Sequence, residues 1–305
     1  MINYILYFIF FSISIPFSMV HSVSFGYEDN FMRFSDLDMV SYYDETGTVN
    51  DYFGDSKYYD SAIISPSLQL TFNPKIKSYK TNLIFKSKYS GYTSSNLKSF
   101  AYFSTRFELK LKSYNWIKFS YSLVPKYYLR TFIDRDLLPL TYYPCDFSNE
   151  NIYLSYSFPI KKIKKTWLDI KLNLNNQFYN EHFTEYDTEI ISLETNLKSL
   201  FFKKYFFSIG YFYAIADNIS YNTSSNLSES TKIDRSYNKV GFKMTAKKTF
   251  NKPLISSLAI KLKINKRDYD LNSWYYDFNN WKKYYETDLV IEYSKKINKK
   301  TTLQI

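Results

Sequence analysis

Apolar and polar residues alternate along most of the 305-residue chain, and the period of this alternation is two. At residues 168–178, for example, Leu168, Ile170 and Leu172 alternate with Asp169 and Lys171. A period of two places successive side chains on opposite faces of a strand, whereas one face of a helix requires a period near 3.6. The pattern predicts β-strands at residues 23–27, 64–72, 79–89, 101–112, 117–130, 152–158, 168–178, 191–197, 205–216, 240–246, 258–264 and 289–293, and a further strand that starts near residue 301.

The segments between these strands alternate in length. Short links are predicted near residues 73–75, 113–115, 160–165, 199–203, 249–253 and 295–300. Longer polar stretches lie between them at 30–56, 90–96, 131–150, 181–187, 218–234 and 268–280. Transmembrane barrels have short periplasmic turns and longer outer loops, and a soluble β-sandwich has no reason to alternate its loops in this way. The chain is therefore predicted to be an all-β, antiparallel, up-and-down transmembrane β-barrel.

The expected number of strands is about thirteen. Single-chain bacterial barrels have even numbers of strands, and Ile305 interrupts the last predicted strand without a terminal aromatic residue. We therefore expect that a C-terminal strand is missing and that the parent barrel has fourteen or more strands.

The N-terminal residues resemble an export signal. Residues 4–17 form an apolar run that Pro16 interrupts, and Val20-His21-Ser22 provides a small-residue cleavage site. A retained helix is the alternative, but the run is shorter than the roughly 20 residues that a membrane span needs. The predicted division is a signal peptide at residues 1–22 and a barrel at residues 23–305.

Aromatic residues make up 21% of the chain, mainly 33 Tyr and 27 Phe. A biased genome would enrich the same residues, but lipid-facing barrels also use aromatic girdles. With its strands arranged as above, the chain resembles the bacterial outer-membrane β-barrel (porin-like) class. The end of the first strand, Gly26-Tyr27-Glu28-Asp29-Asn30, is similar to the acidic-Asn strand end of porin-like barrels and of surface-lipoprotein assembly barrels. The assembly barrels carry a helical-repeat domain ahead of the barrel, and this sequence has none.

The resemblance implies a location in the bacterial outer membrane. The implied partners are outer-membrane lipid, small solutes and the barrel-assembly machinery during biogenesis. The net charge of +11 also suggests nucleic acid, but the lysines are spread over strands and turns without a base-reading motif, so no nucleic-acid partner is expected.

The polar face of the predicted strands carries the candidate functional residues. If the apolar face contacts lipid, the opposite face lines the interior, and its charges are mostly basic. Lysine and arginine rings favour anions, so the interior predicts an anion preference; the alternative is that these charges only solvate the rims or pair with acidic residues. The pore-lining candidates are Lys80, Lys86, Arg106, Lys118, Lys126, Lys171, Lys243, Lys261, Lys263, Glu108 and Glu194.

Other chemistry has weaker support in the sequence. Residues 30–56 form an acidic stretch without calcium-loop spacing, which favours a solvated surface loop, although this stretch is also the one candidate for an internal plug or constriction. His182 and Ser192 lack the spacing of a catalytic arrangement, and Cys145 stands alone in a predicted loop. No catalytic residue, no metal site and no cofactor are therefore expected.

The sequence leaves two functions open. The favoured one is a passive channel for small solutes, because the small residues Ser208, Gly210, Ala214 and Ala216 are expected to leave space inside the barrel. The alternative is a non-conducting barrel for adhesion, surface-protein export or envelope structure.

Overall fold

The structure is a computed structural model. It describes residues 17–33, 54–56, 58–76, 78–134, 136–137, 139, 141–202, 204–222, 224, 230–250, 256–269, 283–296 and 302–304. The strands are β1 (Phe17–Glu28), β2 (Ser61–Phe72), β3 (Lys75–Ile76), β4 (Tyr79–Tyr92), β5 (Phe100–Lys112), β6 (Asn115–Asp134), β7 (Thr141–Pro159), β8 (Thr166–Tyr179), β9 (Thr188–Phe201), β10 (Tyr205–Asn218), β11 (Tyr237–Thr249), β12 (Ser257–Tyr269), β13 (Lys283–Lys296) and β14 (Thr302–Gln304).

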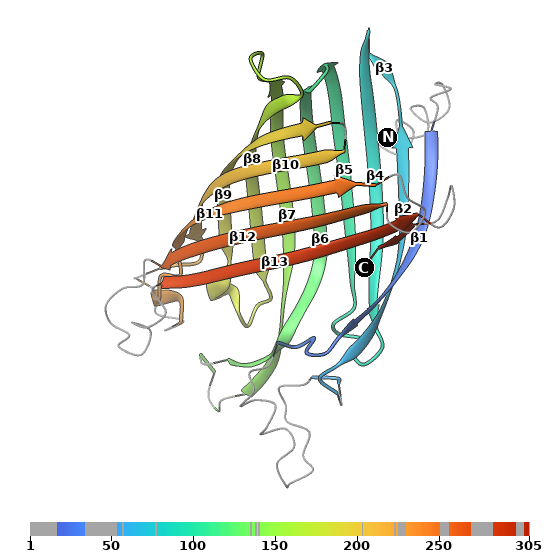
Figure 1. Cartoon of the computed structure of the whole chain (residues 1–305). Helices are drawn as coiled ribbons and strands as arrows, with labels where there is room; N and C mark the ends of the chain where they lie inside the picture. The colour runs from blue at the N-terminus through green and yellow to red at the C-terminus, as the bar shows by residue number, and fades with distance from the viewer. Residues whose placement is uncertain are drawn as a thin grey trace, which may run out of the picture.

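The strands form one antiparallel sheet in which twelve long strands follow one another in chain order (Figure 1). The short β14 pairs with β13, and the two-residue β3 pairs with β4 beside the main path. The only helical elements among the described residues are two 3-10 turns, η2 (Thr184–Tyr186) and η3 (Ser230–Lys232). The predicted all-β, antiparallel, up-and-down arrangement is confirmed.

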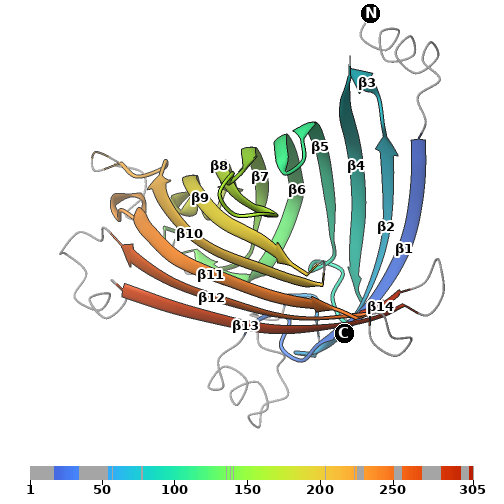
Figure 2. The same ribbon diagram turned by 45° about the horizontal axis from the view of Figure 1, so that its top comes forward.

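The sheet curls strongly but is not closed (Figure 2). Each inner strand pairs with both of its neighbours in the chain, whereas β1 and β14 each have one backbone partner among the described residues. The closed barrel that the sequence predicts is therefore absent from this structure, which has two free edges.

Two predicted strand boundaries are wrong. Strand β1 begins at Phe17 and not at residue 23, and its first residue pairs with Phe72. The predicted signal peptide at residues 1–22 stays a prediction. The sequence predicts a loop at 131–150, but most of this stretch belongs to β6 and β7. Register shifts at Val124/Tyr127 and Tyr128/Arg130 interrupt the alternation there, because a β-bulge inserts an extra residue into one strand.

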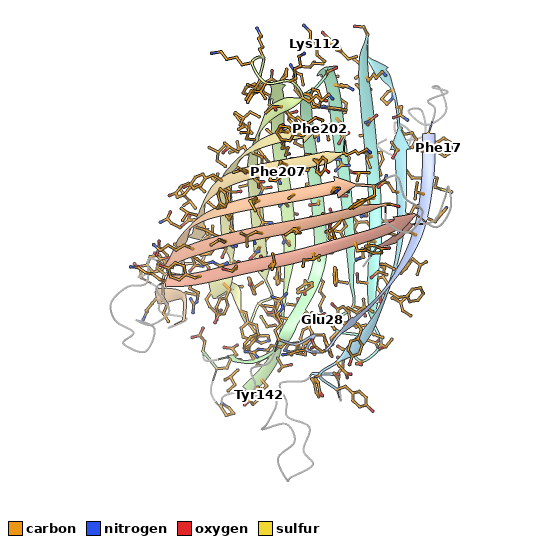
Figure 3. The ribbon with its side chains drawn as sticks, in the orientation of Figure 1. Phe17, Glu28, Lys112, Tyr142, Phe202 and Phe207 are labelled. Atoms are coloured by element: carbon orange, nitrogen blue, oxygen red, sulfur yellow. The ribbon has the colours of Figure 1, made fainter. Side chains whose placement is uncertain are left out.

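The extended β6–β7 pair projects beyond the rest of the sheet. The 20 residues of β6 span about 66 Å at roughly 3.3 Å per residue, whereas most other long strands have 12 to 14 residues. Cys145, predicted to be in a loop, lies in β7 and is buried. Figure 3 places Tyr142, near the start of β7, at the lower tip of the molecule.

The two ends of the sheet differ in their connections. Two residues join β5 to β6, and three join β9 to β10, at the upper end that Lys112 marks in Figure 3. The connections after β1, β10 and β12 are much longer and begin at the opposite end, where Glu28 lies. We call these the short-turn end and the long-loop end. This difference agrees with the predicted alternation of short and long links.

The apolar side of the sheet is exposed or partly exposed along its length. In β10 every odd-numbered position from 207 to 217 is exposed, and every even-numbered position from 208 to 218 is buried. Large apolar side chains occupy the exposed positions of the other strands too, including Phe25, Phe119, Leu172 and Ile260. The polar face is therefore the enclosed, concave side of the curl. Among the described residues, no helix is long and apolar enough to cross a membrane.

Candidate functional site: the polar face of the sheet

Strand register determines which side chains share the polar face. Directly opposed residues of an antiparallel pair point to the same side of the sheet, so each pairing carries the face from one strand to the next. One such row joins Gln69, Lys86, Ser104 and Ser122 across β2, β4, β5 and β6. The same procedure places most of the predicted pore-lining residues on this one face: Lys80, Lys86, Arg106, Glu108, Lys118, Lys171, Glu194, Lys243, Lys261 and Lys263.

Lys126 is the exception. It lies within the β-bulge of β6, and its ammonium is 3.2 Å from Asp146 Oδ2. The bulge breaks the alternation from which its position is predicted, and the described structure therefore does not place it in the rows of the polar face.

One part of the polar face, which we call the basic wall, comprises the inner positions of β4, β5 and β6. Each of five successive cross-strand rows of this wall contains at least one cation. From the short-turn end these rows contain Lys80 with Lys110, Glu108 with Lys118, Ile84 with Arg106, Lys86 with Ser104, and Lys88 with Tyr102. Rows two residues apart are separated by about 7 Å, so the five rows span about 27 Å.

The five rows of the basic wall contain one carboxylate. Glu108 Oε1 lies 3.2 Å from Arg106 Nε, and Glu108 Oε2 accepts a hydrogen bond of 3.1 Å from Asn82 Nδ2. The Lys110 and Lys118 ammonium groups lie 4.9 and 5.8 Å from the centre of the Trp116 ring. Glu108 thus compensates Arg106, while the nearby lysines contact an aromatic ring.

The inner positions of β8 to β13 form the opposite arrangement, which we call the paired wall. Lys243 Nζ donates to Glu194 Oε2 at 2.7 Å, and Lys263 Nζ donates to Asp288 Oδ2 at 3.2 Å. Further ion pairs join Lys198 to Asp169, Lys261 to Glu292, and Lys239 to Glu286. The pairing that the sequence left as the alternative is therefore found in this wall.

Small residues do not leave open space in the paired wall, contrary to expectation. Ser208, Ala214 and Ala216 are themselves buried. A Cβ added at Gly210 would overlap the side chain of Asn196, and one added at Gly241 would overlap the ring of Phe212. Neighbouring side chains therefore lie over the small residues and fill the volume that those residues provide.

At the long-loop end, residues from the connection after β1 pack against the β6 bulge. Phe31, Met32 and Tyr128 form a buried cluster, and Phe31 N donates to Tyr59 O at 3.0 Å. Asp55 also anchors this connection, since its carboxylate accepts from Ser95 Oγ at 2.5 Å and from Leu97 N at 3.0 Å.

Both ends of the predicted plug, at residues 30–33 and 54–56, are thus held at the long-loop end of the sheet, which we also call its mouth. The acidic residues at positions 36, 38, 44, 45 and 51 lie outside the described residues.

A buried lysine lies beside this cluster. Lys98, in the β4–β5 connection, donates from Nζ to Leu129 O at 3.0 Å and lies 5.1 Å from the centre of the Tyr127 ring. Burial lowers the pKa of Lys98 to about 8, because removal from water disfavours the ammonium form. No local pattern in the sequence indicates this residue, because its burial depends on the loop packing.

A row of aromatic rings in mutual contact crosses the polar face at the same end. The ring centres of Phe100, Tyr127, Phe147, Tyr179 and Tyr186 are successively 5.0, 5.5, 5.1 and 5.6 Å apart. Aromatic pairs at such distances stabilise beyond their buried area, so this row ties β5 through β8 to η2.

The structure pairs His182 with a carboxylate. His182 Nδ1 lies 3.0 Å from Asp134 Oδ2, and its ring stacks on Tyr143 at 3.6 Å between centres. No hydrogen bond joins His182 to Ser192 in the described part of the chain, and Ser192 instead faces Ala214 across the β9–β10 pair. The contacts of His182 connect the β8–β9 connection to the projecting β6–β7 pair.

Sequence reasoning missed two contributors to the polar face. Trp116 separates Lys110 from Lys118, and Glu286 lies within 3.4 Å of Lys239 and 3.9 Å of Lys263. Glu286 precedes Asp288 by two positions in an alternating segment, and this spacing could have identified it.

Comparisons with protein-family models, with curated proteins and with solved structures give no significant match.

Proposed function

We propose that this chain forms the wall of a bacterial outer-membrane β-barrel that acts as a porin-like passive channel for small solutes. The supporting observation is the exposed apolar face of the sheet, which lies opposite a polar face that is enclosed most clearly along β10. Soluble proteins rarely expose apolar patches of more than a few hundred Å², and a continuous apolar face of this extent suits a lipid environment.

In this proposal the apolar face contacts acyl chains, and the polar face surrounds the solute path. The short-turn end is periplasmic, and the long-loop end faces outward. The uneven charge of the polar face favours anions, because the cations of the basic wall lack an equal number of carboxylates.

Closure is part of the proposal. Unpaired backbone groups cost several kcal/mol each in hydrocarbon, so the free edges at β1 and at the C-terminal strands must obtain partners in a bilayer. In both ribbon views the end of β13 reaches the region of β1 (Figures 1 and 2). We propose that backbone pairing between the two edges, directly or through an added strand, completes the barrel.

Planar-bilayer recording of the refolded full-length chain tests the channel. The expected result is stable current steps, with a reversal potential in a salt gradient that indicates anion preference. Current steps with cation preference would contradict the proposed anion selectivity and would still support a channel. Recovery of the expressed chain in the aqueous fraction after cell breakage would reject the membrane assignment itself.

A non-conducting barrel is the second candidate, and two observations favour it. The Phe31–Met32–Tyr128 cluster lies at the mouth, and side chains fill the space above the small residues of β10 and β11. A refolded chain that inserts into bilayers and shows no current steps would support this candidate in place of the channel.

A further inference from the structure

The register of β4 and β5 places two lysines directly opposite each other. Lys80 faces Lys110 in the row nearest the short-turn end, and both side chains lie on the polar face. Like charges in direct cross-strand opposition destabilise a sheet. A negative charge nearby relieves this repulsion.

The paired wall provides an internal comparison. Lys243 faces Lys263 in the same type of direct opposition between β11 and β12. There Glu194 and Asp288 each hold one of the two ammonium groups, at 2.7 and 3.2 Å. Where these two lysines face each other, Asp288 of the adjacent β13 holds one ammonium group, and Glu194 of β9 reaches the other across β10.

The Lys80–Lys110 pair has no such carboxylate among the described residues. Its neighbour on β6 in the same row is Trp116, and the nearest acidic position, Glu108, contacts Arg106 and Asn82. Lys118 lies one row away, and the Lys110 and Lys118 ammonium groups lie 4.9 and 5.8 Å from the centre of the same Trp116 ring. Lys80 is exposed, and Lys110 and Lys118 are partly exposed, so solutes can reach them.

We propose that Lys80, Lys110 and Lys118 form a binding site for a small multivalent oxyanion of the phosphate type. A phosphate group offers several acceptor oxygens, and lysine binds it as a point charge, so one ligand can neutralise more than one ammonium. A monovalent anion neutralises only one of the three. Arg106, Lys86 and Lys88 continue the line of cations toward the long-loop end. The solute class named here rests on the proposed channel for its route across the membrane, whereas binding itself does not require conduction.

Calorimetric titration of the full-length chain in detergent micelles with pyrophosphate tests the site. The double variant Lys80→Gln/Lys110→Gln is expected to bind pyrophosphate about tenfold more weakly, because it loses two charge-assisted hydrogen bonds. The control Lys161→Gln/Lys162→Gln removes the same charge from the exposed β7–β8 connection and is expected to change the affinity less than about twofold. The variant Lys80→Arg/Lys110→Arg keeps both charges and is expected to retain binding.

Three results would overturn the site: equal weakening in the two glutamine variants, equal affinity of the wild type for pyrophosphate and chloride, or no binding at all. Circular dichroism confirms in each case that the variant retains its β-sheet, and if the glutamine pair fails to fold, Lys118→Gln replaces it with the same criteria. Binding without current steps would reject the channel and keep the site. Current steps without pyrophosphate binding would reject the site and keep the channel.

Discussion

The basic wall and the paired wall occupy the same concave face but handle charge in different ways. In the five rows along β4 to β6, six cations accompany one carboxylate, and several of the cations are accessible from the concave side. Along β8 to β13, carboxylates from nearby strands hold most of the lysines, and neighbouring side chains cover the small residues.

Because both walls follow the same alternation of apolar and polar positions, the alternation alone does not determine the electrostatics of the interior. The electrostatics depend on the acidic residues at inner positions, which β8, β9 and β13 provide for the lysines of the paired wall. In the proposed barrel both walls face water, and the opposite side of the sheet faces lipid.

The largest expected effect is that of a charge on the apolar face. Leu172 is 53% exposed on the apolar face of β8, and the substitution Leu172→Lys places an ammonium against hydrocarbon in the proposed barrel. We expect a loss of about 2 to 4 kcal/mol in the free energy of unfolding, measured by urea titration in lipid vesicles.

The adjacent substitution Asn173→Lys is the control, because Asn173 lies on the polar face opposite Tyr153 and Ser192. For this variant we expect a loss of less than about 1 kcal/mol in the free energy of unfolding. Equal losses for the two variants would show that the apolar face does not contact lipid.

The next largest effect is that of a larger side chain, which is expected to cost more stability in the paired wall than in the basic wall. In Gly241→Val the new side chain collides with the ring of Phe212 and with Asn265 Oδ1. Overpacking of this kind costs about 1 to 3 kcal/mol, and we expect a value in the upper half of that range.

Ser104→Gln adds the same number of side-chain heavy atoms on the basic wall, between Lys86 and Ser122, where we expect a loss of less than about 1 kcal/mol in the free energy of unfolding. Ser104→Val is the smaller, apolar enlargement at the same position, with the same expected limit. Chemical denaturation of all three variants measures the difference. A cost for Ser104→Gln as large as that for Gly241→Val would contradict the view that the basic wall is the more open of the two walls.

The sequence predicts the strands well because period-two alternation is a local property of the chain. It fails where local signals and long-range packing disagree. Pro144, Asp146 and Ser148 suggest a loop, yet the two β-bulges of β6 allow this segment to pair as a strand. The covering of Gly210 by Asn196 depends on the β9–β10 register, which no local pattern specifies.

The candidate site is predictable in part for the same reason. The face of each basic residue follows from alternation, and almost all candidates are therefore placed together. Their ionic partners follow from register, so the sequence leaves open whether the lysines are paired. The structure shows ion pairs at Lys243 and Lys263 in the paired wall. Among the described residues it shows no ion pair at Lys80 or Lys110 in the basic wall.

A single neutralised charge is expected to have opposite effects on the two walls. Glu194→Gln removes the partner of Lys243 and weakens the acceptor of Asn196 Nδ2, which donates to Glu194 at 2.9 Å. We expect a loss of about 1 kcal/mol, reduced from the value for a buried pair because both side chains are partly exposed.

Lys118→Gln removes one of several like charges from the basic wall, and we expect no loss or a gain of less than about 0.5 kcal/mol. Urea unfolding at low ionic strength compares the two variants. Added salt is expected to reduce both effects, and a loss for Lys118→Gln equal to that for Glu194→Gln would remove the distinction between the walls.

The smallest effect concerns a buried cation that lies outside both walls. The pKa of Lys98 falls to about 8 in the folded chain, below its ordinary value, because burial penalises the ammonium. The unfolded chain therefore binds more protons between about pH 8 and the ordinary lysine pKa, and stability contributed by this residue increases as the pH rises through that window. Below about pH 8 the penalty is fully present.

Lys98→Met removes this titration, and it also removes the hydrogen bond from Nζ to Leu129 O, so the net change at neutral pH is expected to be small. The informative measurement is the slope of the unfolding free energy against pH between about 8 and 10, which is expected to be flatter in the variant. Lys118→Gln leaves the packing around Lys98 untouched and is expected to keep the wild-type slope. An unchanged slope in Lys98→Met would show that the mouth of the sheet, like the basic wall, leaves its cation in contact with water.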